Sequence, residues 1–281
     1  MFFLVSAVFH YLGPSLAVLL FARVGVLGVA WFRIASAALV FAAWRRPWRL
    51  LARLDRSQIR LLIGLGAVLA AMNTCFYLAI DKLPLSTVGA IEFLGTVLLA
   101  VAGARTRRNV AALTLTTSGV ALVTAIRLGG QPLGFALAFA NCLLFMAYVV
   151  LGHRIASLRP REGASAGPAR PGGIDLLAAS MLVAALPVTP LGLPGALSVF
   201  SDPRLLLAGI GVGVCSSVIP YVTDQLAMAR MTRATFALLL ALLPVSATVI
   251  GAIVLRQFPT AQDIAGIALV TLGVALHRER Q

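Results

Sequence analysis

The sequence predicts an all-α integral membrane protein, with ten transmembrane helices in two inverted five-helix repeats. Composition gives the first indication, because 60% of the 281 residues are hydrophobic and only 11% are charged. Soluble domains are roughly 45–50% apolar and about 25% charged. The mean hydropathy of +0.98 means that water would solvate most segments poorly. We therefore expect most of the chain to lie in a lipid bilayer.

The second observation is a series of ten apolar stretches, each close to the ~20 residues that a helix needs to cross a bilayer. They cover residues 2–22, 26–44, 59–80, 84–103, 109–126, 133–152, 174–194, 205–229, 234–254 and 261–276. The first stretch lacks the basic start and the A-x-A cleavage site of a signal peptide, so we interpret it as a span.

The third observation is the uneven distribution of arginine. The loops after the second, fourth, sixth, eighth and tenth stretches hold arginine clusters, which begin at Arg45, Arg105, Arg154, Arg230 and Arg278. The opposite loops hold one basic residue each. Basic residues mark the cytoplasmic side, so both termini are predicted to lie inside, in a multi-pass protein of the bacterial inner membrane. The net charge of +14 therefore reflects topology and not nucleic-acid binding.

An internal repeat supports the division into two halves. Residues 78–103 align without gaps with residues 226–251, and Gly119–Leu122 recurs as Gly273–Leu276. Five spans in each repeat is an odd number, so the two halves must have opposite topology. Inverted repeats are typical of transporters whose substrate site lies near the middle of the membrane, between the halves.

The repeat predicts two domains, residues 1–127 with the first five spans and residues 132–281 with the last five. The long connection at 157–173 is rich in Pro, Gly, Ala and Arg. This composition predicts a disordered cytoplasmic loop inside the second domain.

No motif in the sequence indicates an enzyme or a cofactor. There is no H-E-x-x-H, no G-x-S-x-G and no Walker A motif, and the three cysteines stand far apart in apolar stretches. We expect no catalytic residues, no metal and no cofactor. Any energy for transport must come from an ion gradient, such as the proton gradient, or from the gradient of the substrate.

Four polar residues inside the spans are predicted to form one layer around a central cavity: Arg33, Asn73, Glu92 and Asn141. Ionisable groups in a membrane are costly and are functional by default. A zwitterionic amino acid needs a partner of each sign, which Glu92 and Arg33 supply. The alternative is that Arg33 and Glu92 pair with each other and only hold helices together.

Further candidates are two proton carriers, besides Glu92, and three tyrosines. His10 is either a proton relay or a residue hydrogen-bonded to a neighbouring helix. Asp224 is either a second proton carrier or a surface partner of Arg230. The tyrosines either line the cavity and bind substrate or sit at the membrane interface; they are Tyr77, Tyr148 and Tyr221.

These residues give the chain a resemblance to a known family. Its most specific segments are Gly25–Leu50, Met72-Asn73 with Phe76–Ile80, Glu92-Phe93, Ile219–Tyr221 and Thr235-Phe236. Together they resemble the drug/metabolite transporter superfamily with two EamA-type repeats, in particular its threonine/homoserine exporter branch.

The resemblance implies ten helices in two inverted five-helix repeats around a central cavity, and export of amino acids or related metabolites. Arg33, Asn73 and Glu92 stand where that branch has the same residues, and Asp224 stands where it has an acid. The chain departs from the pattern with Thr96 in place of a proline, Leu240 in place of an acid and Arg256-Gln257 in place of Gly-Glu.

We therefore expect a secondary transporter that exports a small amino acid similar to threonine or homoserine, or a related metabolite, by alternating access. The alternatives are an exporter of broader drug or metabolite specificity, and a membrane scaffold or channel without active transport. The expected partners are the small-molecule substrate and membrane lipid, and a homodimer is compatible with the sequence.

Overall fold

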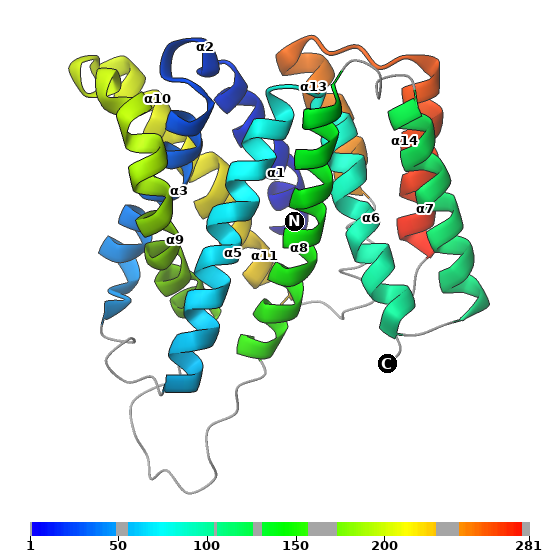
Figure 1. Ribbon diagram of the computed structural model, residues 1–281, viewed down its shortest axis with the longest axis horizontal. Helices are drawn as coiled ribbons and strands as arrows, with labels where there is room; N and C mark the ends of the chain where they lie inside the picture. Colours follow the sequence, from blue (N-terminus) through cyan, green and yellow to red (C-terminus); the bar gives the residue numbers. More distant parts are fainter. Residues whose placement is uncertain are drawn as a thin grey trace, which may run out of the picture.

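A computed structural model describes residues 2–48, 56–103, 106–125, 131–156, 173–228 and 242–276. All regular secondary structure in these ranges is helical, and Figure 1 shows the long helices standing side by side in one bundle. The prediction of an all-helical protein is thus confirmed.

The first half of the chain forms five long helices and one short one. They are α1 (Phe2–Val18), α2 (Phe21–Val24), α3 (Val26–Arg45), α5 (Arg56–Ile80), α6 (Leu85–Gly103) and α7 (Arg107–Ala125). The predicted stretch 2–22 is wrong in one respect, because the helix ends at Val18 and a turn separates it from α2. The positive φ of 73° at Gly25 then lets the chain turn into α3, since glycine adopts this conformation without a steric penalty.

The second half has the same order of long helices with one irregular segment. It contains α8 (Pro132–Ala156), α9 (Gly173–Ala196), the 3₁₀ turn η1 (Leu197–Ser201), α10 (Pro203–Gly213), the π-helical segment η2 (Val214–Val218), α11 (Ile219–Met228), α13 (Leu242–Leu255) and α14 (Ala261–Leu276). Helix α9 begins at Gly173, which was predicted as the last residue of the linker 157–173. Residues 157–172 lie outside the described residues. The predicted stretch 205–229 is helical up to Met228, in the consecutive segments α10, η2 and α11, and residue 229 lies outside the described residues.

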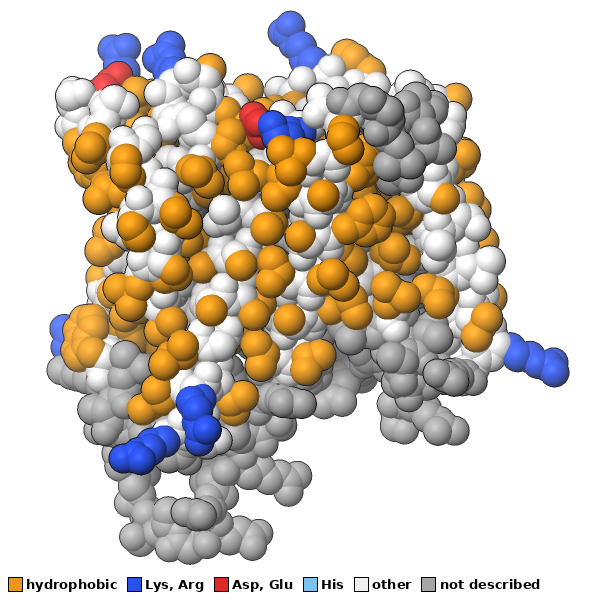
Figure 2. Space-filling view, in the orientation of Figure 1, with side chains coloured by type: hydrophobic (Ala, Val, Ile, Leu, Met, Phe, Trp, Pro, Cys, Tyr) orange, Lys and Arg blue, Asp and Glu red, His pale blue; other side chains and the backbone are white. Residues whose placement is uncertain are grey.

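The hydropathy of these helices is that of a membrane protein. Within the described ranges, four helical stretches are long and apolar enough to cross a bilayer: Val26–Arg45, Arg56–Ile80, Ile174–Ser201 and Pro203–Thr223. Hydrophobic side chains cover the middle of the face in Figure 2, and the lysine and arginine side chains lie toward its two ends. This distribution is expected of a surface with a lipid-facing belt and polar ends.

Helices from the two halves pack against each other throughout the bundle. Extensive contacts join α3 with α9, α7 with α14, α5 with α8 and α9, and α1 with η2, α11 and α13. Further pairs are α3 with α10 and η2, α6 with α8, and α6 with α13. The halves are therefore interleaved, and most of the interior lies between a helix of one half and a helix of the other.

Small residues make the α7–α14 contact especially close. A Cβ atom on Gly273 would lie 2.7 Å from the carbonyl oxygen of Ala112, and one on Gly119 would lie 2.9 Å from Cγ2 of Val270. Gly119 also packs on the backbone of Gly266. Side-chain hydrogen bonds join the two ends of this helix pair. Gln262 Nε2 donates to the Leu122 carbonyl at 2.8 Å, and Arg108 Nε donates to the Leu276 carbonyl at 2.7 Å.

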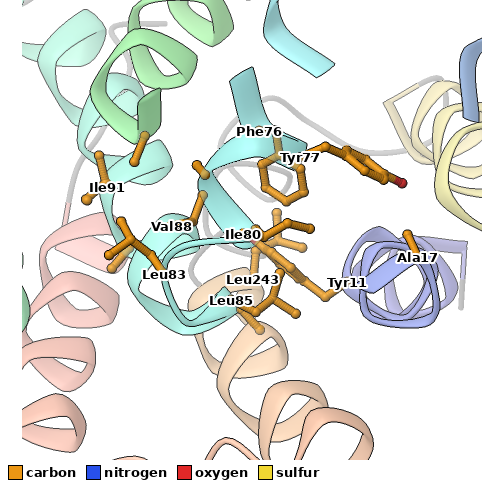
Figure 3. Close-up of a cluster of buried hydrophobic side chains, with 14 of the residues drawn as sticks. Tyr11, Ala17, Phe76, Tyr77, Ile80, Leu83, Leu85, Val88, Ile91 and Leu243 are labelled. Atoms are coloured by element: carbon orange, nitrogen blue, oxygen red, sulfur yellow. The ribbon is translucent and has the colours of Figure 1, made fainter. Parts of the chain in front are cut away.

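The apolar interior joins helices that are distant in the sequence. The cluster in Figure 3 brings Tyr11 of α1 together with Tyr77 of α5, Leu85 of α6 and Leu243 of α13. Tyr11, Tyr77 and Leu85 are completely buried. Burial of large apolar groups fixes how these four helices meet, and it places the polar side chains described next in a closed interior.

Candidate functional site

Arg33 is a buried cation that hydrogen bonds hold in place. Its side chain leaves α3 toward η2, where Nε donates to Ser217 Oγ at 3.0 Å and Nη2 donates to the Ser216 carbonyl at 3.1 Å. Its Cζ lies 5.3 Å from the ring centroid of Tyr77 and 5.9 Å from that of Phe76. Only 5% of the residue is exposed. Hydroxyl, carbonyl and aromatic groups thus surround this cation.

Pro220 explains why a backbone carbonyl is available to Arg33. In a regular helix the carbonyl of Ser216 would accept from the N–H of residue 220, and proline has no N–H to donate. The helix responds by widening into the π-helical segment Val214–Val218, a feature that is frequent at functional sites. The Arg33 guanidinium supplies the missing donor.

Neighbouring helices enclose the same segment. The hydroxyls of Tyr77 and Ser216 lie 3.4 Å apart. A Cβ atom on Gly13 of α1 would lie 2.6 Å from Cα of Ser216, and one on Gly213 would lie 3.0 Å from the Arg33 carbonyl oxygen. Glycine therefore lets α1 and α3 pack directly on the irregular backbone.

Glu92 lies in a second polar region, on α6. The residue is 4% exposed, and its Oε2 has no hydrogen-bond partner among the described residues. The side chain of Asn141 of α8 lies next to the Glu92 carboxyl group. This asparagine is completely buried, and neither its Oδ1 nor its Nδ2 is bonded within the part of the chain that the structure describes. Buried groups normally have partners, so these atoms are exceptional.

Arg33 and Glu92 do not form an ion pair. Ion pairs seen in the described ranges are instead those of Arg45 with Asp175 at 2.6 Å and of Lys82 with Asp81 at 3.5 Å, neither of which includes Arg33 or Glu92. The direct pair that the sequence left open as an alternative is thus absent from this conformation, and the role of the two residues stays a prediction. The pair is absent because the donors of Arg33 are directed at η2 of the second half, whereas Glu92 faces Asn141 of α8.

Asn73 and the remaining tyrosines lie next to Arg33. Asn73 is 2% exposed, and its Nδ2 donates to the Leu69 carbonyl at 2.7 Å. The hydroxyl of Tyr221 is directed at Asn73 and Arg33. Its ring packs on that of Tyr148, with centroids 6.5 Å apart. Tyr77 and Tyr221 are buried and Tyr148 is half-buried. A role of these three tyrosines in binding substrate stays a prediction.

The two other proton-carrier candidates differ in what the structure shows. His10 is half-buried, and its ring contacts that of Tyr11 edge-on, with centroids 5.6 Å apart. Asp224 belongs to α11, one helical turn after Tyr221, and its side chain lies outside the described residues. A proton-carrying role for either residue remains a prediction.

The sequence interpretation missed three residues of this region: Ser216, Ser217 and, as a member of the Glu92 region, Tyr11. A serine pair just before Ile219-Pro220 in an apolar stretch is a usable signal, since proline exposes the carbonyl four residues earlier. Tyr11 carried no such signal. No group of three His, Cys, Asp or Glu side chains that could hold a metal ion occurs among the described residues.

The fold and these buried charges define a multi-pass helical membrane protein with a polar interior between its two halves. The threonine/homoserine exporter RhtA of Salmonella typhimurium is 32% identical over 263 residues, which cover 92% of this chain and 83% of that protein. RhtA of Escherichia coli is 32% identical over 269 residues, covering 94% of this chain and 84% of that protein. The chain belongs to the RhtA family of membrane transporters. These relatives are exporters and not enzymes.

A solved crystal structure also has this fold. It aligns with a TM-score of 0.59 at 20% identity and covers 98% of this chain and 95% of its own. No protein-family model matches the sequence. The predicted resemblance to a threonine/homoserine exporter family is confirmed by the curated relatives.

Proposed function

We propose that this protein is an inner-membrane secondary transporter that exports a small amino acid similar to threonine or homoserine, or a related metabolite, by alternating access. The observation that carries the proposal is that Arg33 and Glu92 are both buried and form no direct ion pair with each other. Membrane-embedded charges without a mutual ion pair are costly, so their retention favours a ligand with charges of its own.

The two charged regions suit the two ends of an amino acid. Arg33 can bind a carboxylate, since a guanidinium presents several donors in one plane. Its present acceptors, the Ser216 carbonyl and the Ser217 hydroxyl, are uncharged groups that a carboxylate can displace. Glu92 offers an acceptor for the ammonium group. Asn73, Asn141, Tyr77, Tyr148 and Tyr221 supply the polar and aromatic surroundings of the proposed substrate site.

We infer that the bundle consists of ten transmembrane helices in two inverted repeats, residues 1–127 and 132–281. The packing supports this, because a contact between two helices of opposite halves has a counterpart between the equivalent helices of the other repeat. The contact of α5 with α8 corresponds to that of α1 with η2 and α11, and the contact of α6 with α8 corresponds to that of α1 with α13.

Individual residues follow the same exchange in the α7–α14 pair. Gly119 packs on Gly266 and Val270, and Gly273 packs on Ala112 and Thr116. Each residue of the second set stands 154 positions from its counterpart in the first set, which is the offset of the repeated Gly-Val-Ala-Leu sequence. A two-fold relation between the halves accounts for this reciprocity.

We further propose that both termini are cytoplasmic and that the proton gradient drives export through Glu92, His10 or Asp224. A reporter fused after Gln281, or inserted near Ala166, should be active in the cytoplasm. A periplasmic signal at either place would contradict the ten-span topology.

Growth tests check the direction and the substrate class. Cells that overproduce the protein should tolerate dipeptides that release toxic amounts of threonine or homoserine inside the cell. Resistance to unrelated drugs, without tolerance to any such dipeptide, would favour a broad-specificity exporter. An unchanged response to both would favour a scaffold.

A further inference from the structure

The region around Glu92 contains more unsatisfied polar atoms than one carboxylate explains. Besides Thr87 Oγ1, four buried atoms near the start and middle of α6 have no hydrogen-bond partner among the described residues. They are Tyr11 Oη, Glu92 Oε2, and Oδ1 and Nδ2 of Asn141. Tyr11 and Asn141 are completely buried and Glu92 is 4% exposed. Each unsatisfied group costs about 1–3 kcal/mol, so their occurrence on three different helices calls for a reason.

Packing on α6 brings the Tyr11 hydroxyl to this place. A Cβ atom on Gly89 would lie 3.0 Å from Tyr11 Oη and 3.2 Å from Cβ of Ala247, so glycine at this position lets the hydroxyl lie against the helix. Gly89 and Glu92 are three residues apart and therefore share one face of α6. The Glu92 carboxyl is a close enough neighbour to act electrostatically on Tyr11.

Asn141 approaches the same carboxyl from α8. Gly95, one turn after Glu92, packs on Cys142. A Cβ atom on Gly95 would lie 3.0 Å from the Cys142 Sγ and 3.3 Å from the Cys142 carbonyl oxygen. Asn141 precedes Cys142 and is the side chain next to Glu92. The two atoms of its amide are therefore held beside the carboxyl by close helix contact, with no protein partner of their own among the described residues.

We propose that Tyr11, Glu92 and Asn141 form a binding subsite for a primary ammonium group, and that Tyr11 is a specificity-determining residue of this transporter. A primary ammonium has three N–H donors and one positive charge. The subsite offers three free acceptors, Tyr11 Oη, Glu92 Oε2 and Asn141 Oδ1, and one negative charge. The proposal rests on the proposed function, because it assigns the ammonium end of that substrate.

The number of donors on the ligand provides the test. Full-length protein in lipid nanodiscs is titrated calorimetrically with L-threonine, with propylammonium and with propyl-trimethylammonium, which keeps the charge and has no N–H group. We expect propylammonium to bind at least about tenfold more tightly than its trimethyl form, since hydrogen bonds to a charged group contribute this much or more. Equal affinities of the wild-type protein for propylammonium and for its trimethyl form would overturn the proposal.

Substitutions locate the effect. Tyr11→Phe should weaken propylammonium binding about tenfold and leave the trimethyl form unaffected. The matched control is Thr271→Val, which also removes a buried, unpartnered hydroxyl, but in the groove between α13 and α14; it should leave both affinities unchanged. Wild-type affinity for propylammonium in Tyr11→Phe would contradict the assignment.

The two proposals fail in different ways. Tyr11-dependent binding of propylammonium, with no binding of L-threonine, would refute the proposed substrate and leave the ammonium subsite standing. The converse result is that L-threonine binds equally well to the wild type and to Tyr11→Phe, while propylammonium and its trimethyl form bind with equal affinity. That result would refute the subsite and leave the proposed function standing. If neither propylammonium nor L-threonine binds, the proposed subsite is overturned.

Discussion

The Nη2 atom of Arg33 donates a 3.1 Å hydrogen bond to the backbone carbonyl of Ser216, the carbonyl that Pro220 leaves without its helical donor. A charged side chain from the first half of the chain thereby stabilises the irregular segment of the second half. Any ligand that competes for this guanidinium also acts on the backbone that joins α10 to α11. The contact therefore links the proposed substrate site to the packing of the two halves.

Replacing Arg33 by lysine should reduce transport at least about tenfold. Lysine keeps the charge, but its ammonium cannot reproduce the planar donor pair that reaches both Ser216 and Ser217. The initial rate of amino-acid efflux from cells with matched protein levels measures the effect. Arg204→Lys, at the exposed start of α10, is the control and should behave like the wild type. Equal efflux for the Arg33 variant would show that the donor geometry is unimportant.

Glu92→Gln should insert and fold normally and abolish transport. A carboxylate in the membrane costs about 2.5–3.5 kcal/mol on insertion scales, so the amide is easier to insert, but it lacks the charge for a cation. The control is Asp202→Asn, which keeps the N-cap of α10, where Asp202 accepts from the Arg204 N–H at 2.9 Å. Efflux and membrane content are measured together.

A double variant, Arg33→Gln with Glu92→Gln, should stay inactive, because the two residues are not an ion pair in the structure. Recovery of full efflux would mean that they only compensate each other, and the substrate-site interpretation would then be wrong.

The close contact between α7 and α14 should be sensitive to a single methyl group. In Gly273→Ala the new Cβ would lie 2.7 Å from the Ala112 carbonyl oxygen, and overpacking of this kind costs about 1–3 kcal/mol. Gly119→Ala should behave in the same way, as the proposed two-fold relation requires. Gly211→Ala is the control, since nothing lies within 4 Å of its Cβ and alanine favours a helix. Thermal unfolding in detergent measures all three, and equal stability of the Gly119 and Gly211 variants would contradict the account.

Most of the helical pattern could be predicted from the sequence, because apolar length and arginine position are local properties. The breaks could not. The turn after Val18 and the π-helical segment Val214–Val218 depend on backbone bonding, which hydropathy does not measure. Pro220 indicated an interruption, but not the direction in which the Ser216 carbonyl would turn.

The buried polar residues of the proposed site were identified in part for a similar reason. Polarity inside apolar stretches identified Arg33, Asn73, Glu92 and Asn141, all of which are buried. Pairing depends on the tertiary structure, so the sequence left open whether Arg33 and Glu92 pair, and the structure shows no direct ion pair between them. Tyr11 was missed as a site residue because tyrosine in an apolar stretch is common; only its position over Gly89 sets it apart.

The departure from the family pattern at Arg256-Gln257 has a structural consequence. Arg256 has a φ of 55°, a left-handed conformation that favours glycine, so Arg256→Gly should stabilise the protein by about 1 kcal/mol. Gln257 Oε1 accepts from the Leu85 N–H at 3.1 Å at the start of α6. Gln257→Ala should therefore cost about 0.5–2 kcal/mol, whereas Gln257→Glu keeps the acceptor. Thermal unfolding of the three variants measures these changes in stability. A more stable Gln257→Ala variant would contradict the stabilising role of the Gln257 acceptor.

Efflux from reconstituted liposomes tests the central claim most directly. Purified protein is reconstituted into liposomes loaded with labelled L-threonine or L-homoserine, and release is followed with and without an inward proton gradient. The account predicts release at least about tenfold faster than from liposomes containing Glu92→Gln, and faster still with the gradient. Release of both amino acids at the rate of protein-free liposomes would contradict the proposed export of threonine-like amino acids.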